Sequence, residues 1–450
     1  MNRRSFINAV AAVSAPLIVP SHVLGRPGRP GANDRIQVGF IGAGGRGRWL
    51  MSYFGNEITD AEIVGVTDCY LPRCYGTDGN TAKPLPDGAN KANKYQDYRK
   101  MFEKEKLDAV FIETTTHARV RIAIHAMQAG LDVYAEKPVS LTISEGRALV
   151  DAVRKYKRVL QAGSQQRSMP INRYASEMVR SGKIGKINSV IVCNYLPGRE
   201  WTPQPEQPVP GGLDWDAWCN QTELRPYHPS LHRGWGDWVD YDGGGQSWGV
   251  SGWGTHGLDQ VQCALGTDGT GPVEMWTEDR RIEDEPDFPL ARNAAWKPFL
   301  GRKPVMLRYA SGTVLKLEEP GKNSHSQLGG VFVGSQGTLQ ILRGNYIANP
   351  PDLKAELAKS APPPTPEGKG EDTFHLRNFL DCLRTHEKPN ADVETAHRAT
   401  TVCHLVNICR KLDRKLNWDP VAEQFTDDEA NALLSRPRRK GFELPKLALA

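Results

Sequence analysis

The sequence predicts an α/β protein of two domains, the first of them built on a parallel β-sheet. Between residues 35 and 162, short apolar runs typical of buried strands alternate with helical patterns, as they do in parallel sheets. The first apolar run, residues 38–41, passes directly into a glycine-rich turn at residues 42–47. A chain of 450 residues with 39% hydrophobic content is also long enough to bury two cores.

The turn reads Gly42-Ala43-Gly44-Gly45-Arg46-Gly47, a G-x-G-x-x-G motif between a predicted strand and a predicted helix. Such a turn binds the pyrophosphate of a dinucleotide, because glycine lets the backbone turn tightly and approach the ligand closely. Asp68 ends the second predicted strand about twenty residues further on, where a carboxylate accepts hydrogen bonds from the adenosine ribose. The sequence therefore predicts an NAD site made by Asp68 and the turn, with Gly42, Gly44 and Gly47 at the pyrophosphate and with Ala43 and Arg46 also in contact.

Two alternatives stay open for this site. The turn could be a purely structural connection, with Asp68 unrelated to it. Arg73 follows Asp68 by a few residues and could meet a 2′-phosphate, so NADP is the second choice of cofactor.

Residues 1–34 are expected to lie outside the fold. Arg3 and Arg4 precede a short apolar stretch that is too interrupted to span a membrane, and no later segment is apolar enough to do so. The pattern is typical of a twin-arginine signal, which exports folded proteins. We therefore expect a periplasmic protein, tethered to the membrane if the signal is retained. A basic, disordered N-terminus is the alternative.

Composition argues against several classes of partner. The net charge of +5 is small and the basic residues are scattered, so no nucleic-acid partner is indicated. The eight cysteines form no recognisable framework, although Cys69 and Cys74 lie close enough to pair in an oxidising compartment. His228 and His232 stand four apart with no third ligand at a useful spacing, so no metal site is predicted.

Polar residues follow two further predicted strands at the edge of the sheet where ligands bind. The strand at residues 108–112 leads to Thr115 and His117, and the strand at residues 132–135 leads to Glu136 and Lys137. Ligands bind beyond the carboxyl ends of the strands in open α/β sheets, so we expect these side chains beside the cofactor. A last strand near residue 160 completes the domain.

Residues 163–450 are predicted to form a second domain that binds the substrate. A strand at residues 187–194, a hairpin at 306–318 and strands within 330–342 indicate a sheet. Six tryptophans fall between residues 215 and 253, which favours a carbohydrate pocket; the alternative is that they pack a long loop. Helices are predicted within residues 374–412 and are expected to pack back on the first domain.

Several motifs in this order resemble the Gfo/Idh/MocA family of oxidoreductases. They are the glycine turn, Glu136-Lys137-Pro138, Gly163-Ser164-Gln165-Gln166-Arg167, Asp242-Gly243-Gly244-Gly245, and Gly254-Thr255-His256-Gly257-Leu258-Asp259. The resemblance covers nearly all of the chain after the signal. It implies a Rossmann domain followed by an α/β domain whose large, mostly antiparallel sheet faces the nicotinamide and often mediates homo-oligomerisation.

The resemblance also implies a reaction: NAD(P)-dependent oxidation of a secondary hydroxyl of a sugar or sugar derivative. Lys137 matches the family's lysine beside the nicotinamide and is suited to stabilise a developing alkoxide. His256 matches the family's histidine and is expected to be a base or proton relay with an ordinary imidazole pKa. Arg167, Trp253 and Asp259 are expected to bind the substrate.

One position departs from the family's pattern. Many family dehydrogenases carry an aspartate four residues before the histidine, where this chain has Gly252. Asp259, Asp242 or Asp240 could take its place, or His256 could act without a carboxylate. The Thr-His-Gly-Leu run at residues 255–258 also resembles a branch of NAD-dependent glycosidases, which oxidise a sugar transiently, eliminate the aglycone and reduce the sugar again. That activity stays open as the alternative.

Overall fold

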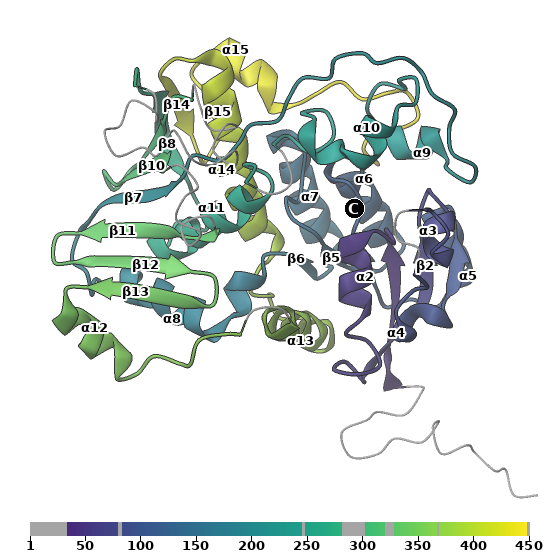
Figure 1. Cartoon of the computed structure of the whole chain (residues 1–450), viewed down its shortest axis with the longest axis horizontal. Helices are drawn as coiled ribbons and strands as arrows, with labels where there is room; N and C mark the ends of the chain where they lie inside the picture. Colours follow the sequence, from purple (N-terminus) through teal and green to yellow (C-terminus); the bar gives the residue numbers. More distant parts are fainter. Residues whose placement is uncertain are drawn as a thin grey trace, which may run out of the picture.

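The computed structural model describes residues 34–79, 83–244, 248–280, 302–319, 328–366 and 369–447. Two β-sheets lie side by side, with helices between them (Figure 1). The predicted export signal, apart from Asp34, lies outside the described residues, and so does Gly245 of the Asp242-Gly243-Gly244-Gly245 motif.

The first sheet has six parallel strands in the order β3-β2-β1-β4-β5-β6. The order reverses between β1 and β4, and open parallel sheets bind their ligands at such a reversal. The predicted parallel, Rossmann-type sheet is therefore confirmed. Its strands are β1 (Ile36–Ile41), β2 (Ala61–Thr67), β3 (Asn93–Tyr95), β4 (Ala109–Ile112), β5 (Asp132–Ala135) and β6 (Leu160–Ala162). The helices of this domain are α2 (Gly45–Met51), α3 (Pro72–Tyr75), α4 (Asp87–Asn90), α5 (Tyr98–Lys104), α6 (Thr116–Gln128) and α7 (Ile143–Tyr156).

Capping residues and a glycine set the ends of these helices. Asp97 accepts a hydrogen bond from the N–H of Arg99 at 2.9 Å where α5 begins, and Thr142 accepts one from Glu145 where α7 begins. Gly130, with φ 84°, follows α6 at a place where the backbone is left-handed.

Aromatic rings fill the centre of the first core. Phe40 of β1 stacks on Phe111 of β4 with ring centroids 4.6 Å apart, and Tyr134 of β5 stacks on Phe111 at 4.9 Å. Helix α13 (Lys369–Thr385) adds Phe379, whose ring meets Phe111 edge-on at 5.5 Å. A helix from the last quarter of the chain thus packs on the first domain, as predicted.

The second sheet has nine strands in the order β13-β12-β11-β7-β10-β9-β8-β14-β15. Its pairs are antiparallel except for β10 with β7, so the predicted mostly antiparallel sheet is confirmed. The predicted hairpin is β9 paired with β10. The strands are β7 (Ile187–Cys193), β8 (Pro272–Thr277), β9 (Val305–Tyr309), β10 (Val314–Glu319), β11 (Gly330–Gly334), β12 (Thr338–Leu342), β13 (Asn345–Asn349), β14 (Leu416–Asp419) and β15 (Gln424–Phe425).

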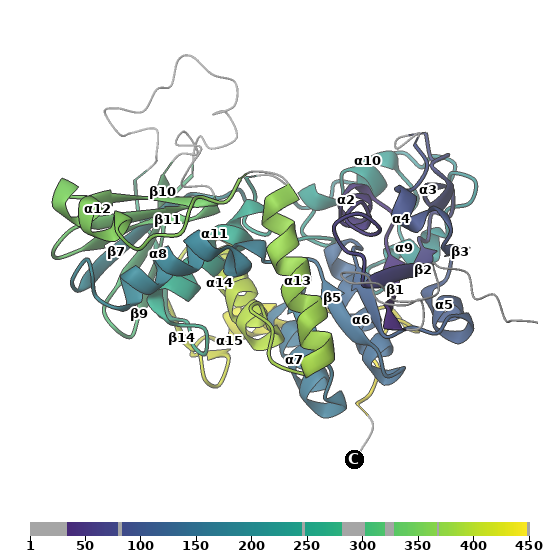
Figure 2. The same ribbon diagram turned by 90° about the horizontal axis from the view of Figure 1, so that it is seen from below.

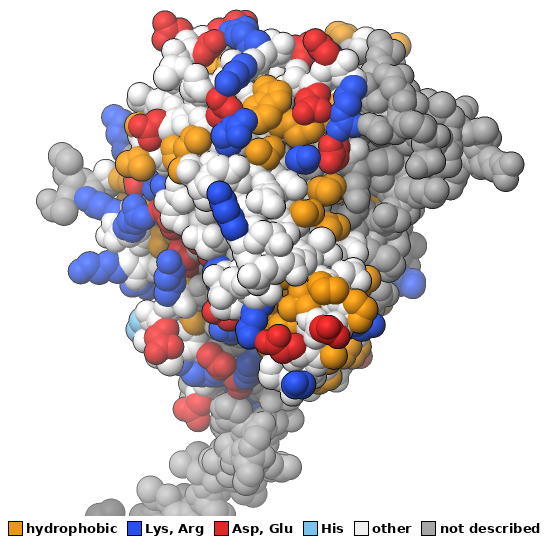
Figure 3. Space-filling model, turned by 90° about the vertical axis from the view of Figure 1, so that its left-hand side faces the viewer, with side chains coloured by type: hydrophobic (Ala, Val, Ile, Leu, Met, Phe, Trp, Pro, Cys, Tyr) orange, Lys and Arg blue, Asp and Glu red, His pale blue; other side chains and the backbone are white. Residues whose placement is uncertain are grey.

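One side of this sheet is covered by helices α8 (Pro170–Arg180), α11 (Trp253–Leu265) and α14 (Val393–Leu412), and α12 (Pro351–Ala358) follows β13 (Figure 2). Along β7, Val190 and Val192 are buried while Ile191 between them is half-buried, which is the period of two expected for a strand with one covered face. The end of the molecule that this domain forms shows hydrophobic patches separated by charged side chains (Figure 3).

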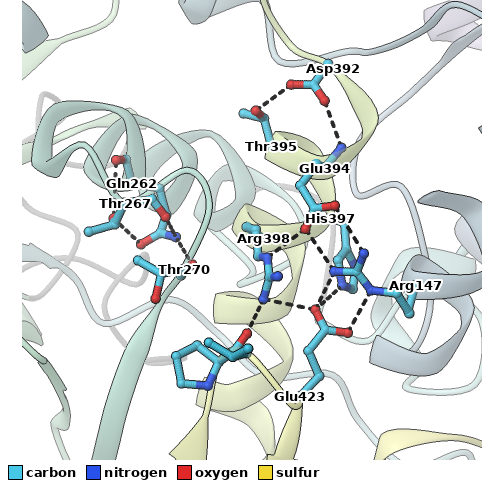
Figure 4. A network of polar contacts seen from close by, with 12 residues as sticks. Arg147, Gln262, Thr267, Thr270, Asp392, Glu394, Thr395, His397, Arg398 and Glu423 are labelled. Atoms are coloured by element: carbon cyan, nitrogen blue, oxygen red, sulfur yellow. Dashed lines mark hydrogen bonds and ion pairs between the residues drawn. The ribbon is translucent and has the colours of Figure 1, made fainter. Parts of the chain in front are cut away.

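An ionic network ties α7 of the first domain to α14 and to the loop after β14. Arg147 lies between two carboxylates, with nitrogen–oxygen distances of 2.9 Å to Glu394 and 2.7 Å to Glu423 (Figure 4). The Nε2 atom of His397 lies 2.7 Å from the same oxygen of Glu423. These contacts fix how the second sheet's helices sit against the first domain.

Two segments extend from the second domain over the first. The chain between β7 and α11 forms α9 (Trp215–Cys219), α10 (Pro229–Arg233) and the 3-10 helix η3 (Trp235–Asp237), which lie above the first sheet in Figure 1. Tyr70, after β2, pairs with Leu213 of this segment. The last segment follows α15 (Asp428–Asn431) and η7 (Ala432–Leu434) and runs to α6, where Leu444 and Leu447 pack.

Within the described residues, none of the helices has the length and apolar character required to cross a membrane.

Candidate active site

Two adjoining cavities lie over the carboxyl ends of the first sheet's strands. The first has a volume of about 450 Å³ and is lined by residues that follow β1, β2, β3 and β4. The second has a volume of about 580 Å³ and lies between the two domains. Arg46, Glu113, Thr114 and Trp235 line both of them, so a ligand that is long enough can occupy the two together.

The glycine turn shapes the first cavity. Gly42 has φ 109°, and a Cβ there would stand 2.7 Å from the carbonyl oxygen of Glu113. A Cβ on Gly44 would meet nothing within 4 Å, because this glycine faces open space in the cavity. Gly42, Gly44 and Arg46 line the cavity, and among the described residues no side chain caps the first turn of α2. The turn therefore leaves room for an anionic ligand.

Two residues of the turn serve the fold and not the cavity. Ala43 is fully buried, and its N–H donates to the Asp68 carboxylate at 2.9 Å. Gly47 lies behind the turn, where a Cβ would stand 2.2 Å from the carbonyl oxygen of Gly42. The expectation that these two residues contact the cofactor is corrected: they let strand, turn and helix pack closely.

Asp68 lies at the end of β2 and lines the first cavity, as expected. Its carboxylate is held by the N–H groups of Ala43 and Tyr70, at 2.9 and 2.8 Å. Arg73 lies 3.9 Å from the same carboxylate and lines the same cavity. The acid is therefore fixed in place before any ligand arrives.

Glu113 adds an acceptor that the sequence did not single out. Both of its carboxylate oxygens are buried and have no hydrogen-bond partner among the described residues. Burial and the nearby Glu136 raise the pKa of Glu113. Such a carboxyl group, placed where the two cavities meet, is suited to pair with a hydroxyl or amide of a bound dinucleotide. The open glycine turn and this unpaired carboxyl group both fit an NAD molecule.

The two residues predicted after β4 are separated by the start of α6. Thr115 precedes the helix and lines the first cavity. His117, in the first turn, is fully buried and lines neither cavity; its Nε2 lies 2.7 Å from the carbonyl oxygen of Trp218. Burial lowers the pKa of His117 to about 4. Its predicted role in cofactor binding is therefore wrong: it packs helix α6 against α9.

The structure brings Lys137, Trp253 and His256 together in the lining of the second cavity. The Lys137 Nζ donates to the carbonyl oxygen of Gly252 at 3.0 Å, and burial lowers the pKa of this lysine. The expectation of an ordinary pKa for His256 is wrong, because burial, and next the charges of Lys137 and Arg343, hold it well below 6.5. The imidazole is therefore neutral near pH 7.

Of the three aspartates considered for the carboxylate that position 252 lacks, Asp242 is the one that lines the second cavity. It lines the second cavity, accepts a hydrogen bond from the Thr116 hydroxyl at 2.6 Å and accepts another from the Ser251 hydroxyl. Burial raises its pKa, although both hydroxyls oppose that shift. Asp240, another of the three candidates, instead pairs with Arg225 at 2.7 Å and with Arg436.

Arg167 and Asp259, predicted to bind the substrate, bind each other. The Arg167 Nε lies 2.8 Å from both carboxylate oxygens of Asp259, and the Arg167 Nη2 lies 2.7 Å from Asp268. Both side chains are buried and line neither cavity. The pair joins the 3-10 helix η2 (Gln165–Ser168) to α11, so the prediction is corrected to a structural role.

Glu136 lines the second cavity and belongs to a chain of charged side chains. Arg46 contacts Glu136 and Asp372, each at 2.7 Å, and Trp49 donates to Asp372 at 2.6 Å. Asp372 comes from α13, more than 300 positions after Arg46 in the chain. No local motif marks it, which is why the sequence did not reveal it.

The tryptophans divide between lining and packing. Trp235 lines both cavities and Trp253 the second, whereas Trp215 and Trp218 stack on each other at 4.6 Å in a small core of their own. The predicted carbohydrate pocket and the alternative of loop packing thus each describe part of the group.

Cys69 and Cys74 are both thiols, so they do not pair. In the described part of the chain, no group of three or more His, Cys, Asp or Glu side chains could hold a metal ion.

Comparison with known proteins places this site in a family. The model of an oxidoreductase family with an NAD-binding Rossmann fold matches residues 36–164, and the model of its C-terminal α/β domain matches residues 182–444. Glycosyl hydrolase family 109 protein 1 of Bacteroides fragilis is 31% identical over 126 residues, 28% of this chain and 27% of that protein. Inositol 2-dehydrogenase/D-chiro-inositol 3-dehydrogenase of Lacticaseibacillus casei is 28% identical over 170 residues, 36% of this chain and 47% of that protein.

These matches span less than half the length of either relative. The fold is also that of the WlbA dehydrogenase from Bordetella pertussis, crystallised with NADH and UDP-GlcNAcA, with a TM-score of 0.56 at 15% identity over 87% of this chain and 99% of that one. Because the two family models together match most of the described chain, the protein belongs to the Gfo/Idh/MocA family of oxidoreductases and carries its NAD-binding Rossmann domain.

Proposed function

We propose that this protein oxidises a secondary hydroxyl group of a sugar or sugar derivative with NAD. The observation that carries the proposal is the second cavity, where Lys137, Asp242 and His256 border a space that adjoins the NAD crevice. An alcohol in that cavity would lie between a cation, a carboxylate and a neutral imidazole. These are the groups that oxidation of an alcohol needs.

The residues have separable tasks in this reaction. The nicotinamide, when bound, accepts the hydride from the alcohol carbon. His256 is neutral and lines the cavity, so its imidazole can accept the hydroxyl proton. Lys137 stabilises the negative charge that develops on the oxygen, and its bond to the carbonyl oxygen of Gly252 fixes where the ammonium points.

A carbohydrate suits the rest of the cavity. Trp235 and Trp253 offer aromatic faces for the C–H faces of a sugar ring, while Asp242 and Arg343 can meet its hydroxyl groups. The inositol dehydrogenase relative acts on a cyclic polyol, as its name states. Asp68 beside the ribose position supports NAD in preference to NADP.

Purified protein mixed with NAD and a panel of sugars, sugar acids and cyclic polyols tests the proposal. We expect one compound to give stoichiometric NADH, seen by absorbance, together with a keto product identified by mass spectrometry. No NADH from any member of the panel, in a protein that binds NAD, would contradict net oxidation.

Redox-neutral glycoside cleavage is the second candidate, and the glycosyl hydrolase family 109 relative is the observation that favours it. In that reaction a ketone at C3 acidifies the C2–H, and loss of this proton expels the aglycone from C1 to leave a C1=C2 double bond. Water then adds at C1 while a solvent proton returns to C2, and the hydride returns to C3, so NAD is unchanged over a cycle. Aryl glycosides in heavy water distinguish the two. Aglycone release with deuterium at C2 and no net NADH would replace the first proposal.

We further propose that the twin-arginine signal exports the folded protein and that copies associate through the second sheet. Arg3 and Arg4 support the first part. A reporter fused to residues 1–34 should reach the periplasm only while both arginines are intact; export of the Arg3→Lys/Arg4→Lys form would contradict it.

The mixed apolar and charged surface of the second domain supports self-association (Figure 3), and light scattering of purified protein measures it.

A further inference from the structure

The last described segment of the chain, residues 436–447, forms part of the first cavity. It leaves the second domain after η7 and runs to α6, as the yellow chain end shows in Figures 1 and 2. Gly441 and Phe442 line the first cavity together with Asp68, Tyr98 and residues of α6. We call residues 436–447 the tail.

The tail is tied to both sides of this cavity. On the side of α6, Arg121 donates to the carbonyl oxygens of Gly441 and Glu443 at 3.1 and 3.3 Å, and Gln128 donates to Lys446 at 3.1 Å. On the side of α9, Arg439 donates to the carbonyl oxygen of Asn220 at 2.8 Å and pairs with Asp216. The tail therefore bridges α6 and α9 across the crevice.

Phe442 is fixed at the middle of this bridge. The guanidinium of Arg439 lies 4.2 Å from its ring centroid and that of Arg121 lies 5.0 Å away. The backbone carbonyl of Phe442 accepts a hydrogen bond from Arg438 at 2.9 Å, and Arg438 in turn pairs with Glu145 of α7. The ring is half-buried and lines the cavity, so one part of it remains available to a ligand.

The position of Phe442 identifies the end of the cofactor that it would meet. The reacting end must lie toward the second cavity, where Lys137 and His256 are. Phe442, Arg121 and Tyr98 line only the first cavity and are absent from the second. They belong to the opposite end, beyond the acid that receives the adenosine ribose.

We propose that the tail is a wall of the NAD site, that Phe442 contacts the adenine, and that release of the cofactor requires the tail to move. The inference rests on the proposed function for its ligand. It adds a binding residue from a segment far from the Rossmann domain in sequence. Because the guanidiniums of Arg439 and Arg121 lie over the ring, the base would meet Phe442 edge-on, which is a favourable arrangement of two aromatic rings.

Equilibrium binding of three ligands to the full chain tests this inference: NADH, ADP-ribose, which lacks the nicotinamide, and nicotinamide mononucleotide, which lacks the adenosine. In Phe442→Ala we expect NADH and ADP-ribose to bind about fivefold more weakly, from the loss of one edge-to-face aromatic contact. Nicotinamide mononucleotide should bind as it does to the unaltered protein. Phe442→Tyr should restore ADP-ribose binding.

Two further variants complete the test. Arg439→Gln keeps Phe442 but loosens the tail at α9, so NADH should leave faster in stopped-flow displacement. Phe374→Ala removes an exposed phenylalanine of α13 that lines neither cavity and should change nothing. If NADH binds the unaltered protein and both tail variants bind and release it equally well, the tail inference fails and the proposed function stands. If the unaltered protein binds neither NADH nor ADP-ribose, both fail.

Discussion

At the scale of single residues, Lys137 is the group whose charge matters most. Its ammonium is buried beside Gly252 and Asp242. Lys137→Met keeps the length of the side chain and removes the charge, so kcat should fall about 10²–10³-fold, the usual cost of removing one stabilising donor. NADH binding, measured by fluorescence, should persist. Lys354→Met, at an exposed position on α12, is the matched control and should keep full activity.

The pH profile of kcat/KM reports on His256 and Lys137, two of the buried titratable groups that line the second cavity. Because His256 stays neutral well below pH 6.5, activity should not fall as the pH is lowered from 7.5 to about 6. On the alkaline side, Lys137 loses its proton below the ordinary lysine value of about 10.4, so activity should fall earlier than that. An acid limb with an apparent pKa near 6.5 that disappears in His256→Asn would contradict this assignment.

Sequence could predict residues whose role is set by the strand that carries them. Asp68, Thr115, Glu136 and Lys137 follow strand ends, and the ends of parallel strands share one edge of the sheet. It failed for His117 and Asp259, because both lie in helices, where one position more or less turns a side chain from the cavity to the packed side.

At the scale of elements, the network around Arg147 holds α7 against α14. Arg147→Met leaves the partly buried Glu394 and Glu423 with one fewer cation and should lower the free energy of unfolding by about 2 kcal/mol, between the values for exposed and for buried ion pairs. Urea denaturation measures it. Arg99→Met, which removes an exposed partner of Asp97, is the control and should cost less than about 1 kcal/mol.

The same network has a defined pH dependence. The pKa values of Glu394 and Glu423 are about 2 in the folded protein; burial would raise them, but Arg147, and at Glu423 also His397, overcomes that effect. Their folded pKa values lie below the unfolded value of about 4.3, so their contribution is complete above that pH and is lost as the pH falls toward 2. The destabilisation caused by Arg147→Met should therefore be smaller at pH 3 than at pH 7.

The order of elements was predictable wherever local pattern decides it. Alternating strands and helices gave the first sheet, and residues on either side of Gly312 gave the hairpin of β9 and β10. Asp372 of α13 and the tail at Phe442 reach the site only through folding over hundreds of residues. Their sequences carry no motif, and only the packed structure brings them there.

At the scale of the whole molecule, buried histidines make stability depend on pH above the range where carboxylates titrate. Burial lowers the pKa values to about 4 for His117, His125 and His375, and to about 3 for His232 and His404. Below the ordinary value of about 6.5 the unfolded chain takes up protons that the folded chain refuses. Stability should therefore be greatest above pH 6.5 and decline as the pH falls toward 4, by up to about 1.4 kcal/mol per pH unit for each histidine.

His232 isolates this effect, because neither of its ring nitrogens has a hydrogen-bond partner in the part of the chain that the structure describes. Its ring packs among aromatic rings, and its centroid lies 5.6 Å from the ring centroids of both Tyr70 and Trp218. His232→Phe therefore removes a titrating group from an environment that suits a phenyl ring. Urea denaturation of both proteins at pH 8, 7, 6 and 5 measures the difference in unfolding free energy. We expect the unfolding free energy of the variant to rise relative to that of the unaltered protein at each step below pH 6.5. An equal difference at pH 8 and pH 5 would show that His232 takes up its proton in the folded protein as readily as in the unfolded chain.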